Sequence, residues 1–241
     1  MTIQTREVAY FDGDVRLLGF LAWDDAIAEP MPAVLISHMW GGRETFVCTK
    51  AEALAAQGYV GFALDLFGDA RLGSGREENT RLIQPFLEDR ALLQRRMLLA
   101  LDTLRGQEMV DNNRVAAIGY CFGGLCVLDL ARTGADLNGV VSFHGLLKPP
   151  ENTQGNRIRA KVLVLHGHDD PMAPVEDVVA LERELTEAGA DWQVHAYGQT
   201  MHAFTNPIAN DPDFGTVYNP VADRRSWVAM QNFLEEIFTT S

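Results

Sequence analysis

The sequence predicts an α/β protein with a mostly parallel central sheet, helices on both faces and an antiparallel N-terminal hairpin. Short apolar runs alternate with longer helical patterns, which is the order that crossover helices between parallel strands produce. Several of these runs are apolar throughout, as expected for strands that are buried on both faces. No stretch is long and polar enough to separate two cores, so we expect one domain over residues 1–241.

The first two strands are expected to form the hairpin. Residues 8–11 and 16–22 flank Asp12-Gly13-Asp14, and Asp-Gly supplies the positive φ of a tight turn. The other expected strands cover residues 33–36, 60–64, 115–118, 140–143, 162–165 and 193–196. The expected helices cover residues 48–57, 89–104, 123–132, 175–188 and 222–238. Residues 68–84 are rich in Gly, Arg and Glu and lack a period, which predicts a surface excursion beside the site.

Composition excludes several kinds of partner. The formal net charge is −13, and nucleic acids and anionic membrane surfaces both require a basic face, so we expect neither as a partner. Cys48, Cys121 and Cys126 do not form a disulfide pattern and favour a reducing compartment. The first residues lack the apolar core of a signal peptide, and no apolar run is long enough to span a bilayer. We therefore expect a cytoplasmic protein.

The most informative stretch is Gly119-Tyr120-Cys121-Phe122-Gly123-Gly124, between an expected strand and an expected helix. In the G-x-S-x-G pattern of α/β-hydrolases, the nucleophile occupies a sharp strand-to-helix turn, and small residues on either side let the backbones pass. Here cysteine takes the place of serine. The N-terminus of the following helix favours a thiolate over a thiol. The pattern therefore predicts that Cys121 is the nucleophile of a cysteine hydrolase.

Such a nucleophile needs an acid and a base that follow it in chain order. After the strand at residues 162–165, Asp169 and Asp170 compete for the role of the acid. We favour Asp170, because Asp-x-x-x-Pro, here ending at Pro174, is typical of the acid turn of these enzymes. Asp169 is then a turn or capping residue. His202 lies between the last expected strand and the last expected helix, and it is the expected base.

The oxyanion that forms during attack on a carbonyl requires two donors. We expect the backbone N–H of Phe122, the residue after the nucleophile, and the N–H of Met39, in the loop after the strand at residues 33–36. Further residues are expected to line the substrate pocket or its entrance. They are His38, Trp40, His144, Phe204 and Arg71. For His144, a structural role is as compatible with the sequence as a pocket role. For Trp40, the equally compatible alternative is a core position that covers the sheet edge.

The acid turn also contains histidines. His166 and His168 stand beside Asp169 and Asp170, a composition that suggests metal ligands. However, Asp-Pro turns commonly gather such residues, and no separate cluster completes a site. We therefore expect no metal. The two cysteines outside the elbow are expected in the core as small buried hydrophobes.

Two other classes of protein are compatible with the elbow. In one, the fold binds a ligand or senses redox state through a reactive but non-hydrolytic Cys121. In the other, the chain is a scaffold without chemistry. An acid and a histidine in the required order argue against both classes. A sensor thiol needs only a low pKa and access, and a scaffold needs neither partner.

The chain resembles the dienelactone hydrolase family of α/β-hydrolases over essentially its whole length. The resemblance rests on the cysteine elbow at residues 119–124, the aspartate turn from Asp170 to Pro174, and His202, in this order. It implies a single-domain hydrolase without metal or organic cofactor that cleaves small-molecule esters or lactones through an acyl-cysteine intermediate. In the best-known activity of the family, the substrate is a cyclic enol ester bearing a carboxylate. We expect a monomer or a small homo-oligomer.

Two positions depart from the pattern of the family's best-known members. Those members hold the thiol with a glutamate in the loop after the first central strand, where this chain has His38. They bind the substrate carboxylate with an arginine shortly after the catalytic histidine, where this chain has residues 204–207 without arginine. Arginines of the expected excursion are candidates to bind the carboxylate instead, namely Arg71, Arg76 and Arg81. In such loops, however, arginines are more often solvated charges than ligand contacts. The prediction is therefore ester or lactone hydrolysis, without commitment to dienelactone.

Overall fold

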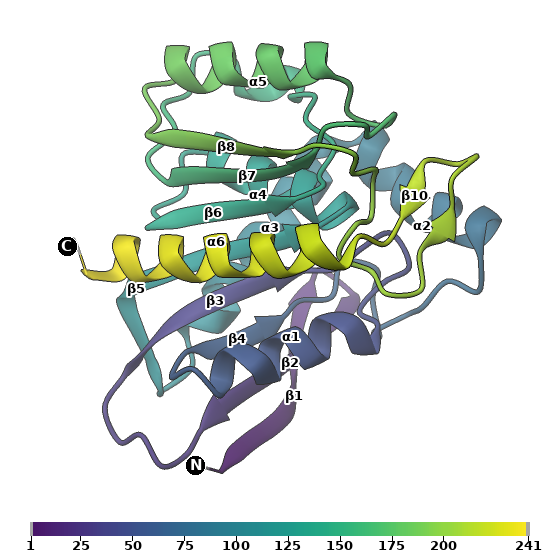
Figure 1. Ribbon diagram of the computed structural model, residues 1–241. Helices are drawn as coiled ribbons and strands as arrows, with labels where there is room; N and C mark the ends of the chain where they lie inside the picture. Colours follow the sequence, from purple (N-terminus) through teal and green to yellow (C-terminus); the bar gives the residue numbers. More distant parts are fainter. Residues whose placement is uncertain (1, 240–241) are drawn as a thin grey trace. The chain divides into compact units, whose positions relative to one another are not determined.

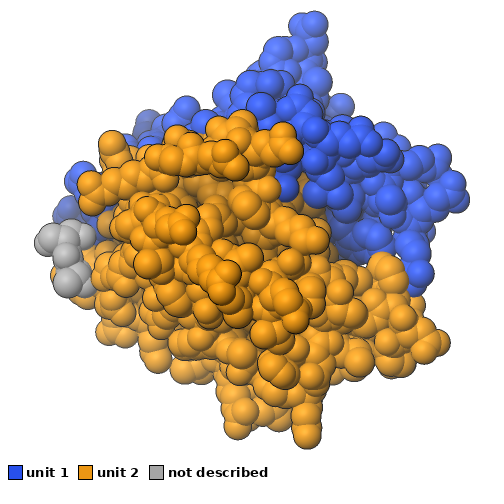
Figure 2. Space-filling model, turned by 90° about the horizontal axis from the view of Figure 1, so that it is seen from above, with its two compact units in different colours: residues 1–118 blue, residues 119–241 orange. Residues whose placement is uncertain are grey.

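The computed structural model describes residues 2–239, and the chain divides into two compact units, Met1–Ile118 and Gly119–Ser241 (Figure 2). The fold class is confirmed, because the structure is α/β with a mostly parallel central sheet, helices and an antiparallel N-terminal hairpin (Figure 1). The expectation of one domain over residues 1–241 stays a prediction.

The first unit contains a sheet with the strand order β1-β2-β4-β3-β5. The bounds are β1 (Ile3–Asp12), β2 (Val15–Asp24), β3 (Met31–Ser37), β4 (Val60–Ala63) and β5 (Val110–Tyr120), the last of which continues into the second unit. β1 and β2 pair antiparallel and close with Asp12 opposite Val15, and Gly13 in the turn has a φ of +60°. β2 pairs antiparallel with β4, and β3 pairs parallel with β4. The expected hairpin is confirmed, with both strands longer than expected.

Two long helices cover opposite faces of this sheet. α1 (Thr45–Ala55) packs against β2 and β4, and α3 (Arg90–Arg105) packs against β1 and β3 (Figure 1). The side chain of Asp89 caps α3 by accepting the N–H of Leu92 at 3.0 Å, which satisfies one of the free donors at the helix start. Both helices begin and end within three residues of the expected bounds.

The second half of the expected surface excursion at residues 68–84 belongs to a helix that was not expected, α2 (Arg76–Glu88). Only Asn79 and Phe86 of this helix are buried, its first turn is acidic, and Pro85 lies inside it. The helix is stabilised locally, since Glu78 in its first turn accepts the N–H and hydroxyl of Ser74 at 3.1 and 2.6 Å.

The second unit contains three parallel strands in the order β6-β7-β8. The bounds are β6 (Gly139–Phe143), β7 (Lys161–Gly167) and β8 (Trp192–Tyr197). The helices are α4 (Phe122–Arg132), α5 (Val175–Glu187) and α6 (Pro220–Thr239), with a 3-10 turn at Glu151–Thr153. α4 packs against β6, α6 lies along β6 and β7, and α5 packs against β8 (Figure 1). A short antiparallel pair, β9 (Asn210–Asp211) and β10 (Thr216–Val217), was not expected.

The core of each unit consists of buried aliphatic and aromatic side chains on these strands and on the helix faces against them. In β6 and in all but the first residue of β7, every position is buried, which agrees with the apolar runs that predicted central strands. Within residues 2–239, no helix has the length and apolar character needed to cross a bilayer.

Candidate active site

Cys121 lies at the junction of β5 and α4, in the tight turn that the glycine pattern predicts. Its φ and ψ are +55° and −117°, a conformation that non-glycine residues rarely adopt and that surrounding structure must hold. A Cβ on Gly119 would overlap the carbonyl of Gly123, so only glycine permits this approach of strand and helix. The turn leaves Cys121 partly exposed at the N-terminus of α4. This combination of strain and exposure is typical of a nucleophile elbow.

The acid turn follows β7 and places the two candidate aspartates differently. Asp170 is buried, and its Oδ2 lies 2.7 Å from Nδ1 of His202. Its Oδ1 accepts the backbone N–H of Met172 at 2.8 Å, so both carboxylate oxygens are held. Asp169 is exposed, and its N–H donates to the carbonyl of Thr200 at 2.9 Å. Asp170 is therefore the aspartate that is paired with the histidine.

His202 is buried, and its backbone is bonded to β10 and to the residue before β10. The N–H of His202 donates to the carbonyl of Gly215 at 3.0 Å, and the carbonyl of His202 accepts the N–H of Val217 at 3.1 Å. Its Nε2 has no hydrogen-bond partner among the nitrogen and oxygen atoms of residues 2–239. Burial opposes a charge on the ring, but a thiolate at Cys121 and the carboxylate of Asp170 outweigh burial and raise the pKa of His202 to about 10. The structure thus brings Cys121, His202 and Asp170 together.

His144 follows β6 and lies among the residues of this site. Its ring contacts His202 and Phe204 edge to face, with centroid distances of 5.2 and 5.0 Å. Its Nδ1 accepts the backbone N–H of Cys121 at 3.1 Å, and its Nε2 lies 2.7 Å from the hydroxyl of Thr205. Burial and the nearby charge of His202 hold the pKa of His144 well below its usual value.

The oxyanion donor expected from this unit is the backbone N–H of Phe122. Phe122 is the first residue of α4, so this N–H lies in the first turn of the helix, where the helix dipole favours negative charge. The other expected donor, the N–H of Met39, belongs to the first unit. Met39 is buried, and its carbonyl accepts the N–H of Gly42 at 3.2 Å. Both donor roles stay predictions.

Among the expected pocket residues of the first unit, His38 is fully buried, with both ring nitrogens bonded. Nδ1 donates to the carbonyl of Met39 at 2.6 Å, and Nε2 accepts the N–H of Leu66 at 3.3 Å. Burial lowers the pKa of His38, so the ring is neutral and ties two loops together. Phe204 in the second unit is fully buried as well, and the pocket roles of His38 and Phe204 stay predictions.

Arg71 and Trp40 have some exposed surface. Arg71 pairs with Glu78 at 3.0 Å, and Ser74 and Arg71 together lower the pKa of Glu78 to about 2. The guanidinium of Arg71 therefore forms a surface ion pair. This agrees with a solvated surface charge, which is one of the two roles that the sequence allowed for Arg71. Pocket roles for Arg71 and Trp40 stay predictions.

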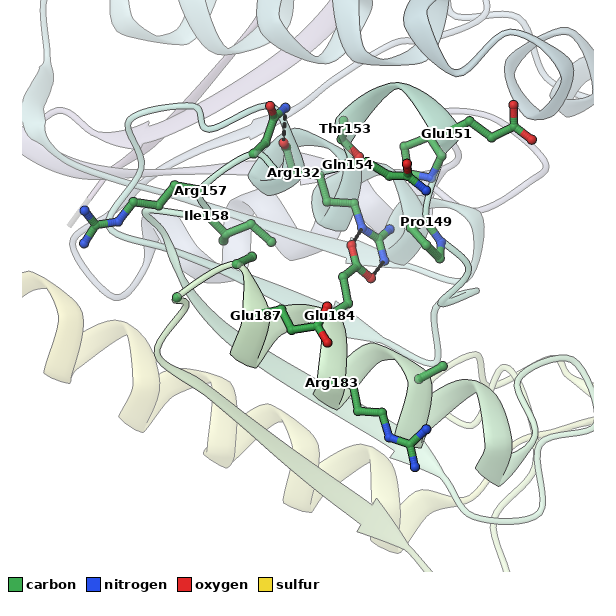
Figure 3. A pocket seen from close by; sticks show the side chains of 16 residues that line it. Arg132, Pro149, Glu151, Thr153, Gln154, Arg157, Ile158, Arg183, Glu184 and Glu187 are labelled. Atoms are coloured by element: carbon green, nitrogen blue, oxygen red, sulfur yellow. Dashed lines mark hydrogen bonds and ion pairs between the residues drawn. The ribbon is translucent and has the colours of Figure 1, made fainter.

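A cavity of about 930 Å³ in the second unit is lined by residues of α4, α5 and the 149–158 segment. Its charged centre is Arg132, whose guanidinium binds both carboxylate oxygens of Glu184 at 2.7 and 2.8 Å, Asp129 at 3.1 Å and the carbonyl of Leu147 at 2.8 Å (Figure 3). The side chains of Arg157 and Arg183 point away from this pair (Figure 3). Because four of the five N–H donors of Arg132 bind protein oxygens, we interpret this cluster as structural.

The described chain was also searched for side chains that could bind a metal ion together. Within residues 2–239, no three His, Cys, Asp or Glu side chains are arranged to hold a metal ion. Of the two histidines in the acid turn, His166 is buried and His168 is exposed. The geometry therefore provides a partly exposed cysteine, a histidine and a buried carboxylate paired with that histidine, without a metal centre in the described chain.

The structure keeps the order that the sequence predicts, with a cysteine at a strand-to-helix turn, an aspartate after β7 and a histidine before α6. The chain belongs to the dienelactone hydrolase family, whose profile matches residues 18–238. It is therefore a hydrolase of this family.

The chain is similar to relatives with solved structures and to relatives known from sequence. A solved structure described as a dienelactone hydrolase-like promiscuous phosphotriesterase from metagenomic libraries has a TM-score of 0.93 and 39% identity, covering 98% of this chain and 99% of that one. An uncharacterized protein of Caenorhabditis elegans is 36% identical over 149 residues, which are 61% of this chain and 94% of that protein. A putative carboxymethylenebutenolidase of Aquifex aeolicus is 24% identical over 213 residues, 85% of this chain and 87% of that protein.

Two contacts of the site were not expected from the sequence. One is the bond from the N–H of Met172 to Asp170, and the other is the contact of Thr205 with His144. Neither residue type carries a signal in its local sequence, since a backbone N–H is present at almost every position and Thr205 stands in a loop without regular spacing. Only the spatial neighbours identify these contacts.

Proposed function

We propose that the protein hydrolyses a carboxylic ester or lactone through an acyl-cysteine intermediate on Cys121. The observation that carries the proposal is the bond of 2.7 Å between buried Asp170 and Nδ1 of His202, beside the cysteine of the elbow. This bond directs the other ring nitrogen, Nε2, toward proton transfer with the thiol. A buried thiol or a scaffold would not require it.

The proposed reaction begins with a thiolate of Cys121 paired with an imidazolium of His202. The thiolate attacks the carbonyl carbon, and the carbonyl oxygen becomes an oxyanion, for which the backbone N–H groups of Phe122 and Met39 are the proposed donors. Collapse of the intermediate breaks the bond to the leaving oxygen, which takes the proton from His202. Water then attacks the acyl-cysteine with His202 as base, releasing the acid and restoring the thiol.

The chemistry of sulfur narrows the proposed substrates. A thiolate is a better leaving group than an alkoxide or an amide, so the tetrahedral intermediate expels an activated oxygen or sulfur more readily. Enol esters, lactones, aryl esters and thioesters are therefore favoured over amides. Relatives named as putative carboxymethylenebutenolidases and as a probable lactonase support the lactone class. Residues 204–207 contain no arginine, so we propose no particular carboxylate-bearing lactone.

The test is mass spectrometry of the protein mixed with an activated aryl ester. We expect an acyl adduct on Cys121 and release of the phenol, both lost in Cys121→Ala. Cys48→Ala is the matched thiol control, since Cys48 is also partly exposed and burial raises its pKa. If the wild type and His202→Ala carry no adduct, and product does not exceed the Cys121→Ala background, the chain is a binding or redox protein on this fold instead.

A second candidate activity is phosphotriester hydrolysis. It is favoured by the 39% identity, over nearly the whole chain, to the structure described as a promiscuous phosphotriesterase. The same thiolate would attack phosphorus and expel an aryl oxide, leaving a phosphorylated cysteine that water must cleave. A phosphotriester with an aryl leaving group tests this activity. Phosphorylated Cys121 with repeated turnover supports it, and a single stoichiometric release with a stable adduct shows inhibition only.

A further inference from the structure

We propose that His144 is a positioning residue that joins the nucleophile elbow to the histidine loop, with its imidazole held in one neutral tautomer by Thr205. The inference rests on the proposed hydrolase function and concerns two residues outside the three that carry the reaction.

The tautomer follows from the hydrogen-bond partners. The backbone N–H of Cys121 points to two acceptors, the carbonyl of Phe143 at 3.0 Å and Nδ1 of His144 at 3.1 Å. A ring nitrogen that accepts a bond from an N–H carries no proton, so the proton of the neutral ring is on Nε2. Nε2 then donates to the hydroxyl oxygen of Thr205 at 2.7 Å. Both nitrogens of His144 are thereby used, and their roles are fixed.

The environment keeps the ring uncharged. His144 has no exposed surface, and both burial and the charge of His202 lower its pKa. A second ring proton would place an Nδ1–H against the N–H of Cys121, which removes the acceptor and opposes two donors. A charged His144 would also repel the imidazolium of His202, whose ring centroid is 5.2 Å away. A neutral His144 is therefore compatible with the thiolate–imidazolium pair, and a charged one is not.

The contacts of His144 reach the elbow and the loop of the base at the same time. Thr205 is buried and stands three residues after His202, on the same loop. The backbone N–H of His144 donates to the carbonyl of Leu165 in β7 at 2.8 Å, which anchors the residue to the sheet. Through its ring, the nucleophile and the base loop share one rigid connection.

Backbone strain explains why the elbow needs such a connection. Cys121 and His144 both have positive φ values, +55° and +37°, in a region that side-chain-bearing residues seldom adopt. Strained conformations persist only where surrounding bonds and packing determine them. A shift of about 1 Å in the nucleophile can cost roughly a hundredfold in rate. Loss of the bond from Cys121 to His144 should therefore lower kcat more than it changes KM.

The isosteric change Thr205→Val tests the inference, because it removes the hydroxyl and keeps the volume. We expect kcat for an activated aryl ester to fall roughly tenfold with KM nearly unchanged, since Nε2–H is left buried without an acceptor and the ring loses its fixed position. Thr205→Ser, which restores the hydroxyl, should recover most of the lost turnover. If Thr205→Val keeps the wild-type kcat, or Thr205→Ser falls as far as the valine variant, the hydroxyl does not position the ring.

A second measurement does not depend on how the variants fold. In the wild type with 15N-labelled histidine, NMR should show His144 with a protonated Nε2 and an unprotonated Nδ1 at neutral pH. A proton on Nδ1 would overturn the inference. Failure of the proposed hydrolase function is distinguishable, because the wild type would then form no acyl adduct on Cys121. Failure of the inference alone leaves the adduct and its turnover intact in Thr205→Val.

Discussion

The bond between Asp170 and His202 allows a sharp test of the proposed chemistry. In Asp170→Asn, the oxygen that accepts the N–H of Met172 at 2.8 Å can be retained, which turns the new amide NH2 toward Nδ1 of His202. An NH2 donor requires an unprotonated Nδ1, so the ring proton moves to Nε2. A ring protonated on Nε2 when neutral cannot accept the proton of the Cys121 thiol.

The size of the effect follows from what is lost. The carboxylate stabilises the imidazolium through a bond of 2.7 Å in a buried site, and it is one of the two groups that raise the pKa of His202 to about 10. Without it, burial acts against the imidazolium with only the thiolate to oppose it. General acid and base catalysis contributes roughly 10²- to 10⁴-fold, and we expect kcat/KM of Asp170→Asn to fall within this range.

The assay is hydrolysis of an activated aryl ester, together with the thiolate absorbance near 240 nm at neutral pH. Asp169→Asn is the matched control, because Asp169 is the adjacent aspartate and is exposed. We expect Asp170→Asn to lose both turnover and thiolate absorbance and Asp169→Asn to keep both. The opposite ranking of the two variants would refute the assignment of the acid, and wild-type turnover in Asp170→Asn would refute the role of the carboxylate.

Three further predictions concern pH, stability and the elbow. Because the pKa of His202 is raised from 6.5 to about 10, its stabilising contribution is fully present below pH 6.5 and is lost as the pH rises toward 10. The urea midpoint of the wild type should fall more over this range than that of His202→Gln. Arg132→Met should lower the free energy of unfolding by about 3–5 kcal/mol, since it leaves buried Asp129 and half-buried Glu184 without their cation. Arg81→Met, from an exposed pair, should cost below about 0.5 kcal/mol in urea titrations. Gly119→Ala should reduce esterase activity by roughly a hundredfold or more, because its Cβ overlaps the next turn of the elbow.

Each of these predictions has an outcome that contradicts it. Parallel pH curves for the wild type and His202→Gln would show that the charged ring does not stabilise the folded protein. An Arg132→Met variant as stable as Arg81→Met would show that the buried cluster is replaceable. Gly106→Ala, whose Cβ meets only ordinary contacts at 3.5 Å, controls for the loss of a glycine. Equal activity of the two alanine variants would contradict the steric argument for the elbow.

Most strands and helices were predictable, because burial of a face makes apolar residues recur at regular positions in the sequence. β6 and β7 are buried almost throughout, and their apolar runs predicted central strands within a few residues of the observed bounds. α2, which has an acidic first turn and Pro85 in its interior, was not expected. Burial alone did not decide which elements were predicted, since β8 and the short β9–β10 pair both lack buried residues and only β8 was expected.

The sequence by itself determined which residues are candidates for chemistry at the elbow. The glycines around Cys121 are needed by a local turn, and an aspartate and a histidine follow in order, so spacing alone selected them. The tertiary structure decided what these residues touch. Asp170, rather than exposed Asp169, bonds His202, because the turn after β7 buries one carboxylate and leaves its neighbour outside.

The structure also decided the roles of residues whose type is ambiguous. The sequence left His144 between a pocket residue and a structural one, and His38 was expected at the entrance. In the structure His38 is buried with both nitrogens bonded, and His144 accepts from the nucleophile's own backbone and reaches Thr205, 61 positions along the chain. A histidine's role depends on which partner each nitrogen meets, and partners far apart in sequence are brought together only by packing. The sequence therefore identified the candidate nucleophile, and the fold determined which groups surround it.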